Sequence, residues 1–178
     1  MHYEFEDGFI LEFSFIKNSF PHMIGLHKLI DIPLLYKFST KQENANYIIS
    51  KIKNGKLTES DIKSSIFFPK IENRYNNFYS ENLFSLSYTD VIIDFDIKKL
   101  QKSKLKNTKF ILFEKDKTKG YRQLCVAKSK TSLYYPETFF YEPSDYYIQN
   151  QTIQKIKKIQ MIKKDGTIYF EDSFIITD

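Results

Sequence analysis

The sequence predicts an α+β protein, with an N-terminal strand and a helical block packed on a mainly antiparallel sheet. Three observations indicate this class. Apolar residues alternate near the N-terminus, recur at helical spacing up to about residue 87, and alternate again afterwards. The later strands are separated by short turn sequences rather than by helices, which disfavours parallel winding. We expect one domain over 1–178, with a mostly helical part at 1–87 and an antiparallel sheet at 88–178.

The first predicted elements are a strand and a helix. Residues 8–17 predict a strand buried mainly on one face, because large apolar side chains alternate along it: Phe9, Leu11, Phe13 and Phe15. FPHMIGLHK at 20–28 then predicts a helix, with Asn18 or Ser19 as its N-cap and Pro21 in its first turn. Pro33 is expected to end this segment.

Two more helical stretches complete the first half. STKQENANYIISKIKNG predicts a helix with Ser39 or Thr40 as N-cap and Gly55 as its C-terminal stop. TESDIKSSIFF places Thr58 and Asp61 in capping-box positions. A further helical stretch begins at Pro69, with its apolar residues at Ile71, Tyr75, Phe78 and Leu83.

The second half predicts consecutive strands. VIIDFDI at 91–97 alternates, and KFILFEKDKTKGYRQLCVAK reads as a hairpin that turns at 117–120. SLYYPETFFYEP is another extended segment. Asp165-Gly166, between apolar alternations, is the strongest short hairpin signal in the chain.

Composition limits the class of protein and its partners. The chain has 178 residues, 17 Phe and 13 Tyr but only 5 Gly and 5 Pro, which fits compact elements over flexible linkers. Its single cysteine, Cys125, excludes an intramolecular disulfide and suits a reducing cytoplasm. An acidic N-terminus and the lack of a membrane-length apolar run predict a soluble, cytoplasmic protein with no membrane partner.

The net charge favours a polyanionic partner without proving one. Lys and Arg number 27 against 22 Asp and Glu, a formal charge of +5. A low-GC genome would produce a similar Lys-, Asn- and Ile-rich composition. The sequence has no glycine-rich phosphate loop, HExxH, CxxC pair or GxSxG elbow, so it lacks the usual signatures of nucleotide-binding proteins, zinc proteases and serine hydrolases.

The two histidines of FPHMIGLHK are the first candidate site. His22 and His27 project about 140° apart on an ideal helix, so we expect no shared metal ion, and no cofactor is indicated. The structural alternative is that both merely flank a packing stripe of Met23, Ile24 and Leu26.

The second candidate site lies on two predicted strands. In YRQLCVAK, Arg122 shares a largely apolar face with Leu124 and Val126, so it needs an anionic partner, either a carboxylate or a substrate phosphate. In YYPETFF, the hydroxyl of Thr138 can donate to a phosphate or bond within the sheet.

These stretches resemble the phage-associated branch of the barnase–EndoU–colicin–RelE superfamily of small ribonucleases. FPHMIGLHK matches a helix motif, and a late basic strand followed by YYPETFF matches the strand motifs, in the expected order across most of the chain. The resemblance implies a ribonuclease fold in which His22, Arg122 (or Lys128) and Thr138 are catalytic. Catalytic residues differ among branches of the superfamily.

The chemistry needed is simple to state. Metal-free RNA cleavage requires a base, an acid and cations around the phosphorane, which a histidine, an arginine and a hydroxyl can supply. The residues expected to bind substrate are His27, Lys28, Tyr121, Lys128 and Tyr135. Aromatic strand residues can stack bases, although they more often pack in a core.

We therefore predict a metal-independent endoribonuclease that cleaves RNA by 2′-OH transesterification. Its expected biological role is that of a toxin or phage-associated effector held by an antitoxin or inhibitor partner. The alternative is a non-catalytic module that binds nucleic acid or protein. Which RNA is cut, and in what oligomeric state, does not follow from the sequence.

Overall fold

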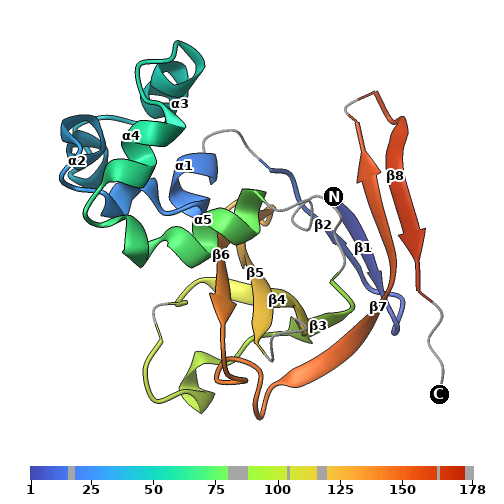
Figure 1. The fold of residues 1–178 in the computed structure, drawn as a ribbon. Helices are drawn as coiled ribbons and strands as arrows, with labels where there is room; N and C mark the ends of the chain where they lie inside the picture. Colours follow the sequence, from blue (N-terminus) through green and yellow to red (C-terminus); the bar gives the residue numbers. More distant parts are fainter. Residues whose placement is uncertain (16–18, 80–87, 104, 116–119, 164, 175–178) are drawn as a thin grey trace. The chain divides into compact units, whose positions relative to one another are not determined.

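The computed structural model describes residues 1–15, 19–79, 88–103, 105–115, 120–163 and 165–174, with side chains except at 77–79 (Figure 1). It is an α+β protein with an antiparallel sheet, which confirms the predicted class. The chain forms two compact units. Met1–Phe15 and Phe84–Asp178 make up the sheet unit, and Ile16–Leu83 make up the helical unit.

The sheet unit contains eight strands in the described residues. They are β1 (His2–Phe5), β2 (Ile10–Glu12), β3 (Asp90–Ile93), β4 (Thr108–Lys115), β5 (Tyr121–Lys128), β6 (Tyr134–Glu142), β7 (Thr152–Ile162) and β8 (Ile168–Ser173). The order is β2-β1-β7-β3-β4-β5-β6, with β8 paired to β7. Figure 1 shows β7 as a long, bent strand that passes β1 and β8 and continues to β3.

The hairpins predicted from the sequence are present. Lys115 pairs with Tyr121 at the closed end of β4–β5, and the turn at 116–119 lies outside the described residues. Gly166 adopts φ +85°, and the amide of Lys163 donates to Thr167, which closes the β7–β8 hairpin. The strand β1 was not predicted from the sequence; its His2 pairs with Gln160 of the distant β7.

The sheet curls so that strands far apart in its order meet. A parallel bridge joins Phe13, just after β2, to Tyr134 of β6. The ring of Phe110 on β4 lies 6.0 Å from that of Phe5 on β1 and 5.3 Å from that of Tyr134. The inner face of the curl is therefore lined with aromatic rings, as the Phe-rich composition suggests.

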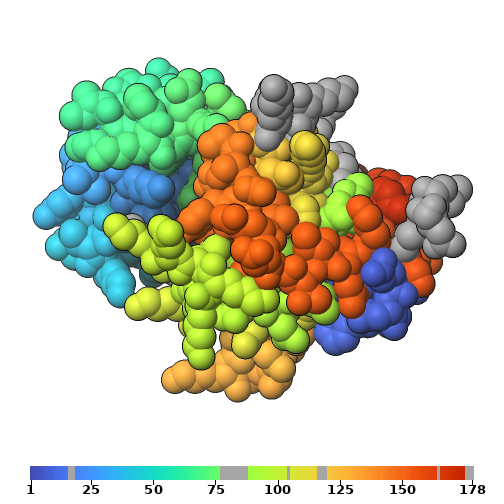
Figure 2. Space-filling view, turned by 90° about the horizontal axis from the view of Figure 1, so that it is seen from below, coloured from blue at the N-terminus to red at the C-terminus, as the bar shows by residue number. Residues whose placement is uncertain are grey.

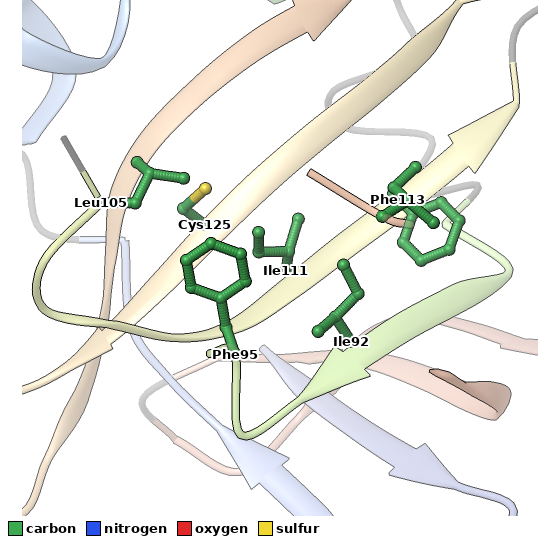
Figure 3. Close-up of a cluster of buried hydrophobic side chains, with 7 residues drawn as sticks. Ile92, Phe95, Leu105, Ile111, Phe113 and Cys125 are labelled. Carbon is green, nitrogen blue, oxygen red and sulfur yellow. The ribbon is translucent and has the colours of Figure 1, made fainter. Parts of the chain in front are cut away.

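The outer face of the central strands carries a second apolar cluster. Figure 3 shows Ile92, Phe95, Leu105, Ile111, Phe113 and Cys125 gathered on this face. Two segments that follow β3 and β6 meet beside it, since the Tyr146 hydroxyl donates to the carbonyl of Lys102 and accepts from its amide. In Figure 2 these segments, yellow-green and orange, touch at the surface. Cys125 is fully buried within this cluster.

The helical unit is built from short helices. They are α1 (Phe20–Met23), η2 (Leu26–Lys28), α2 (Pro33–Ser39), α3 (Ala45–Lys53), α4 (Glu59–Ser64), η3 (Phe68–Lys70) and α5 (Glu72–Tyr79). The predicted capping box is present: Thr58 Oγ1 accepts from the Asp61 amide at 3.1 Å, and Asp61 Oδ2 accepts from the Thr58 amide at 2.8 Å. Ile71 and Tyr75 are buried as predicted, whereas Leu83 and the Phe78 side chain lie outside the described residues.

Two helix boundaries differ from the prediction. Pro33 begins α2 instead of ending a segment, since a missing N–H costs nothing in a first turn. Ser39 and Thr40 end α2 instead of capping the next helix, and the Thr40 hydroxyl donates back to the carbonyls of Tyr36 and Lys37. The cap of α3 is Asn44, whose side chain accepts from the Tyr47 amide.

No helix among the described residues combines the length and apolar character needed to cross a membrane.

Candidate functional site

The motif FPHMIGLHK does not form one continuous helix. It breaks at Gly25, which adopts φ +85°, so that α1 ends and the 3₁₀ helix η2 begins. An added Cβ at this position would lie 2.9 Å from Cγ2 of Ile71, so the backbone needs glycine for its space as well as its conformation.

The break brings the two histidines together. The ring centroids of His22 and His27 lie 5.4 Å apart, and His22 also contacts the ring of Phe38 at 4.5 Å. The expected divergence of about 140° assumed an ideal helix and is wrong, because Gly25 reverses the chain between the two residues. Met23, Ile24 and Leu26 are buried as predicted.

Burial keeps both imidazoles neutral at lower pH than usual. The partial loss of solvent around its ring lowers the pKa of His22, which is still exposed overall, and the deeper burial of His27 lowers its pKa more strongly, to about 4. Smaller contributions to the His27 pKa come from His22, Lys28 and Arg74, all of them basic. The pair therefore combines two proton-transfer groups with two nearby cations.

Arg122 has a carboxylate partner on the neighbouring strand. Its Nε lies 3.0 Å from Oε1 of Glu114, directly opposite on β4, and both side chains are largely buried, at 14% and 13% exposed. Sequence analysis left a carboxylate and a substrate phosphate as alternatives, and the structure supplies the carboxylate. Whether Arg122 also acts on substrate stays a prediction.

Arg122 and Thr138 do not share a face of the sheet. Arg122 pairs with Tyr141 across β5 and β6, whereas Thr138 pairs with Cys125, three residues further along β5. Side chains alternate between faces along a strand, so Thr138 projects with Cys125 and Arg122 projects the other way. The two predicted catalytic residues therefore cannot line the same face of the sheet.

The remaining sheet residues differ in accessibility. Lys128 is exposed and lies over the ring of Tyr134, with its Nζ 5.4 Å from the centroid. Tyr135 is half-buried opposite Ala127. Tyr121 packs edge-on against Phe113 and the outer apolar cluster, which favours its structural alternative over a base-stacking role.

Comparison with family models matches residues 1–175 to the family described as phage-Barnase-EndoU-ColicinE5/D-RelE like nuclease4. The chain belongs to this nuclease family. No match was found among curated proteins or among solved structures. The family agrees with the resemblance seen in the sequence motifs and supports a nuclease role for this chain.

In this family member, the predicted catalytic and substrate-binding residues divide between the two units. His22, His27 and Lys28 belong to the helical unit, and Arg122, Lys128 and Thr138 belong to the sheet unit. The sequence motifs also predict that His22 lies in one cleft with Arg122 and Thr138; because these two project from opposite faces of the sheet, that prediction can hold for only one of them. The contact between His22 and His27 needs no such meeting, because it forms within the helical unit.

Two residues that act on the candidate site were not predicted from the sequence: Glu114, which pairs with Arg122, and Arg74, which acts on His27. Glu114 was not expected to pair with Arg122, although its position opposite Arg122 follows once the hairpin register is known. Arg74, on α5, has no local sequence signal that connects it to His27, 47 positions earlier.

A metal site was not expected, and the described part of the nuclease has no group of three or more His, Cys, Asp or Glu side chains that could hold an ion. Metal independence nevertheless remains a prediction about the reaction, to be tested with a chelator.

Proposed function

We propose that this nuclease is a metal-independent endoribonuclease that cleaves RNA by 2′-OH transesterification. The observation that carries the proposal is the contact between the two imidazoles, 5.4 Å apart, beside basic side chains. The names barnase, EndoU, colicin and RelE in the family description support RNA as the substrate.

The reaction requires two coordinated proton transfers. A base takes the proton of the ribose 2′-OH, O2′ attacks phosphorus, and the 5′-oxygen leaves with a proton from an acid, so that a 2′,3′-cyclic phosphate remains. We assign the base to His27, whose pKa of about 4 keeps it neutral, and the acid to His22, whose pKa is lowered less. Cations are needed around the phosphorane as its charge develops.

The sheet residues have narrower proposed roles. Lys128, exposed beside Tyr134, is a candidate for binding the RNA backbone, and Tyr135 for stacking a base. Thr138 is retained as a candidate hydroxyl donor, and Arg122 as a candidate phosphorane-stabilising cation. Because Glu114 offsets the charge of Arg122, a structural role for this pair must be tested directly.

The test is cleavage of RNA in the presence of a chelator. The wild type should cut RNA, should leave a 2′,3′-cyclic phosphate, and should spare a DNA oligonucleotide of the same sequence, because DNA lacks the attacking hydroxyl. Binding without cleavage would favour the alternative of a non-catalytic module.

His22→Ala should lower cleavage at least about a hundredfold while the protein still folds, since a positioned acid or base contributes about that much. His2→Ala is the matched control, because His2 lies in β1 and pairs with Glu12. Thermal unfolding and activity should be measured on the same preparations. Unchanged activity per folded His22→Ala molecule would exclude His22 as the catalytic residue.

We also propose that the activity serves a toxin or phage-associated effector that an inhibitor protein restrains. The phage association in the family description supports this role. Expression of the wild type in bacteria should arrest growth, whereas His22→Ala should not. Equal growth of both strains, with equal amounts of soluble protein, would argue against a toxin.

A further inference from the structure

The strand β6 carries a β-bulge at Glu137. Thr138 pairs with Cys125 of β5, and Pro136 pairs with the next β5 residue, Val126, so Glu137 has no residue opposite it on β5. An extra residue of this kind bends the strand and redirects a side chain, and bulges are common beside active sites. The bulge therefore gives Glu137 a direction that a regular strand would not give it.

The carboxylate of Glu137 reaches across β5 to β4. Oγ1 of Thr108 donates a hydrogen bond to Oε2 of Glu137 at 2.5 Å. Thr108 is buried and pairs with Ala127, which lies on β5 between the two strands. The methyl group of Ala127 is small enough for the Glu137 side chain to pass over it. The hydroxyl of a buried threonine thus fixes the direction of this carboxylate.

The charge of Glu137 has no ion-pair partner in the part of the chain that the structure describes, although the protein carries a net charge of +5. Glu114 and Asp90, which are also partly buried, do form ion pairs, with Arg122 and Lys155. The hydrogen bond from its threonine partner uses one of about four acceptor positions on the Glu137 carboxylate. Because the side chain is only half-buried, the other positions are available to donors on a bound molecule.

Two side chains with free groups lie on the same face of the sheet. Residues directly opposite each other on paired strands project from one face. Tyr135 pairs with Ala127 and Thr138 pairs with Cys125, so both project from the outer face, to which Glu137 also turns. Among the described residues, the half-buried Tyr135 ring has no aromatic partner and the Thr138 hydroxyl has no hydrogen-bond partner.

An aromatic ring beside a directed hydrogen-bonding group is the combination by which proteins recognise unpaired nucleobases. We infer that Tyr135 and Glu137 form a nucleobase subsite on the sheet unit, in which Tyr135 stacks the base and Glu137 selects guanine. The assignment of this base to an RNA substrate rests on the proposed function. The bound base would then lie beside Thr138, the candidate hydroxyl donor of that reaction.

Guanine is the base whose edge matches a carboxylate best. Its N1–H and its N2 amino group lie side by side, so both donate to the two oxygens of Glu137. Adenine and cytosine each offer one amino group beside an acceptor nitrogen. Uracil offers one N–H between two carbonyl oxygens, which a carboxylate repels. A guanine stacked on Tyr135 presents its donor edge to Glu137, two residues further along β6.

The experiment compares the binding of GMP and IMP by NMR titration. IMP is GMP without the N2 amino group, so the comparison isolates one hydrogen bond to a charged acceptor. The wild type should bind GMP about tenfold more tightly than IMP. Glu137→Gln should lose most of this preference, because an amide has a single acceptor oxygen. The variant should fold, since that oxygen can still accept from Thr108.

Three further variants test the interpretation. Glu142→Gln removes the same charge from the end of β6, where Glu142 accepts from Ser144, and should keep the full preference for GMP. Tyr135→Leu removes the stacking ring and should weaken GMP and IMP equally, by about tenfold. If Glu137→Gln fails to fold, Glu137→Asp remains decisive, because it retracts the carboxylate by one methylene and should also lower the preference.

The outcomes separate this inference from the proposed function. The subsite is wrong if the wild type binds GMP and IMP equally or binds neither, or if a folded Glu137→Gln protein keeps the preference. RNA cleavage with any of these results would leave the endoribonuclease standing. Selective binding of GMP through Glu137 without RNA cleavage would establish the base subsite and refute the endoribonuclease.

Discussion

The pKa values of the two histidines determine when the site can transfer protons. The base must be neutral and the acid protonated, so kcat/KM should rise with pH through about 4 as His27 loses its proton. It should fall again as His22 loses its proton, below the usual histidine value of 6.5. We expect a bell-shaped profile with its maximum on the acid side of 6.5, measured as initial rates on a short RNA with chelator present.

The profile of kcat provides the internal control for this prediction. If substrate phosphate raises the His27 pKa, the acid limb of kcat should lie at higher pH than that of kcat/KM. A flat profile between pH 4 and 6.5 would contradict the assignment of the two histidines.

The left-handed conformation of Gly25 is needed to place His27 beside His22. Gly25→Ala should destabilise the protein by about 2 kcal/mol, because a left-handed backbone costs a side chain about 1–2 kcal/mol and the new Cβ meets Ile71. Displacement of His27 from His22 should also lower cleavage by roughly tenfold or more. Chemical denaturation and activity measure the two effects.

Gly55 offers a matched control in the same unit. It has φ +65° with no atom within 4 Å of an added Cβ, so Gly55→Ala carries the backbone cost without the contact. Equal losses of stability and activity in the two variants would show that the surroundings of Gly25 have no special importance.

At the scale of elements, the pairing of β4 with β5 holds the Glu114–Arg122 ion pair. Removing one member of a buried ion pair leaves the other charge buried without its partner. Glu114→Gln and Arg122→Met should therefore each lower the free energy of unfolding by about 3 kcal/mol. The double variant should recover part of that loss, and a double-mutant cycle of unfolding free energies measures the coupling.

The same variants distinguish a structural role of Arg122 from a role in catalysis. If Arg122 contacts the phosphorane, Arg122→Met should lower cleavage per folded molecule and Glu114→Gln should not. If both variants retain full activity per folded molecule, Arg122 has a structural role only.

Elements with local signals were the ones that the sequence predicted well. The capping box at Thr58 and Asp61 needs only neighbouring residues, as does the β7–β8 turn at Gly166. The strand β1 was missed, because four residues give a weak pattern and its partner β7 comes much later in the chain. The contact between the histidines was missed because 20–28 was predicted as one continuous helix, whereas the helix ends before Gly25.

At the scale of the whole molecule, net charge should govern RNA affinity. Each phosphate contact to single-stranded RNA contributes about 0.7 to the slope of log affinity against log salt. Lys28→Gln and Lys128→Gln should each reduce that slope by about 0.7. Arg122→Met should leave the slope unchanged if Arg122 only pairs with Glu114, and should reduce it if Arg122 contacts a phosphate. Binding measured over a range of salt concentrations provides the test, and salt-independent affinity would favour the compositional explanation of the basic charge.

The fold class could be predicted from periodicity, but the candidate site could be predicted only in part. His22 and His27 were found as a sequence motif, and their chemistry follows from residue type. Arg74 reaches His27 only through packing of α5 near Gly25, and Glu114 reaches Arg122 only through hairpin register. Such relations depend on distances between elements, which a single sequence does not specify.

The pairing of β1 with β7 has a consequence for folding during synthesis. His2 is synthesised long before its partner Gln160, which lies far along the chain. Contacts between such distant residues form slowly, because a long loop must close before they are gained. During synthesis β1 therefore has no β7 to pair with, and Tyr3 and Phe5, which are buried in the folded protein, are exposed until β7 has been synthesised. The β1–β7 pairing of this nuclease can therefore form only after β7 has been synthesised, and chaperone binding to β1 should decline once β7 emerges.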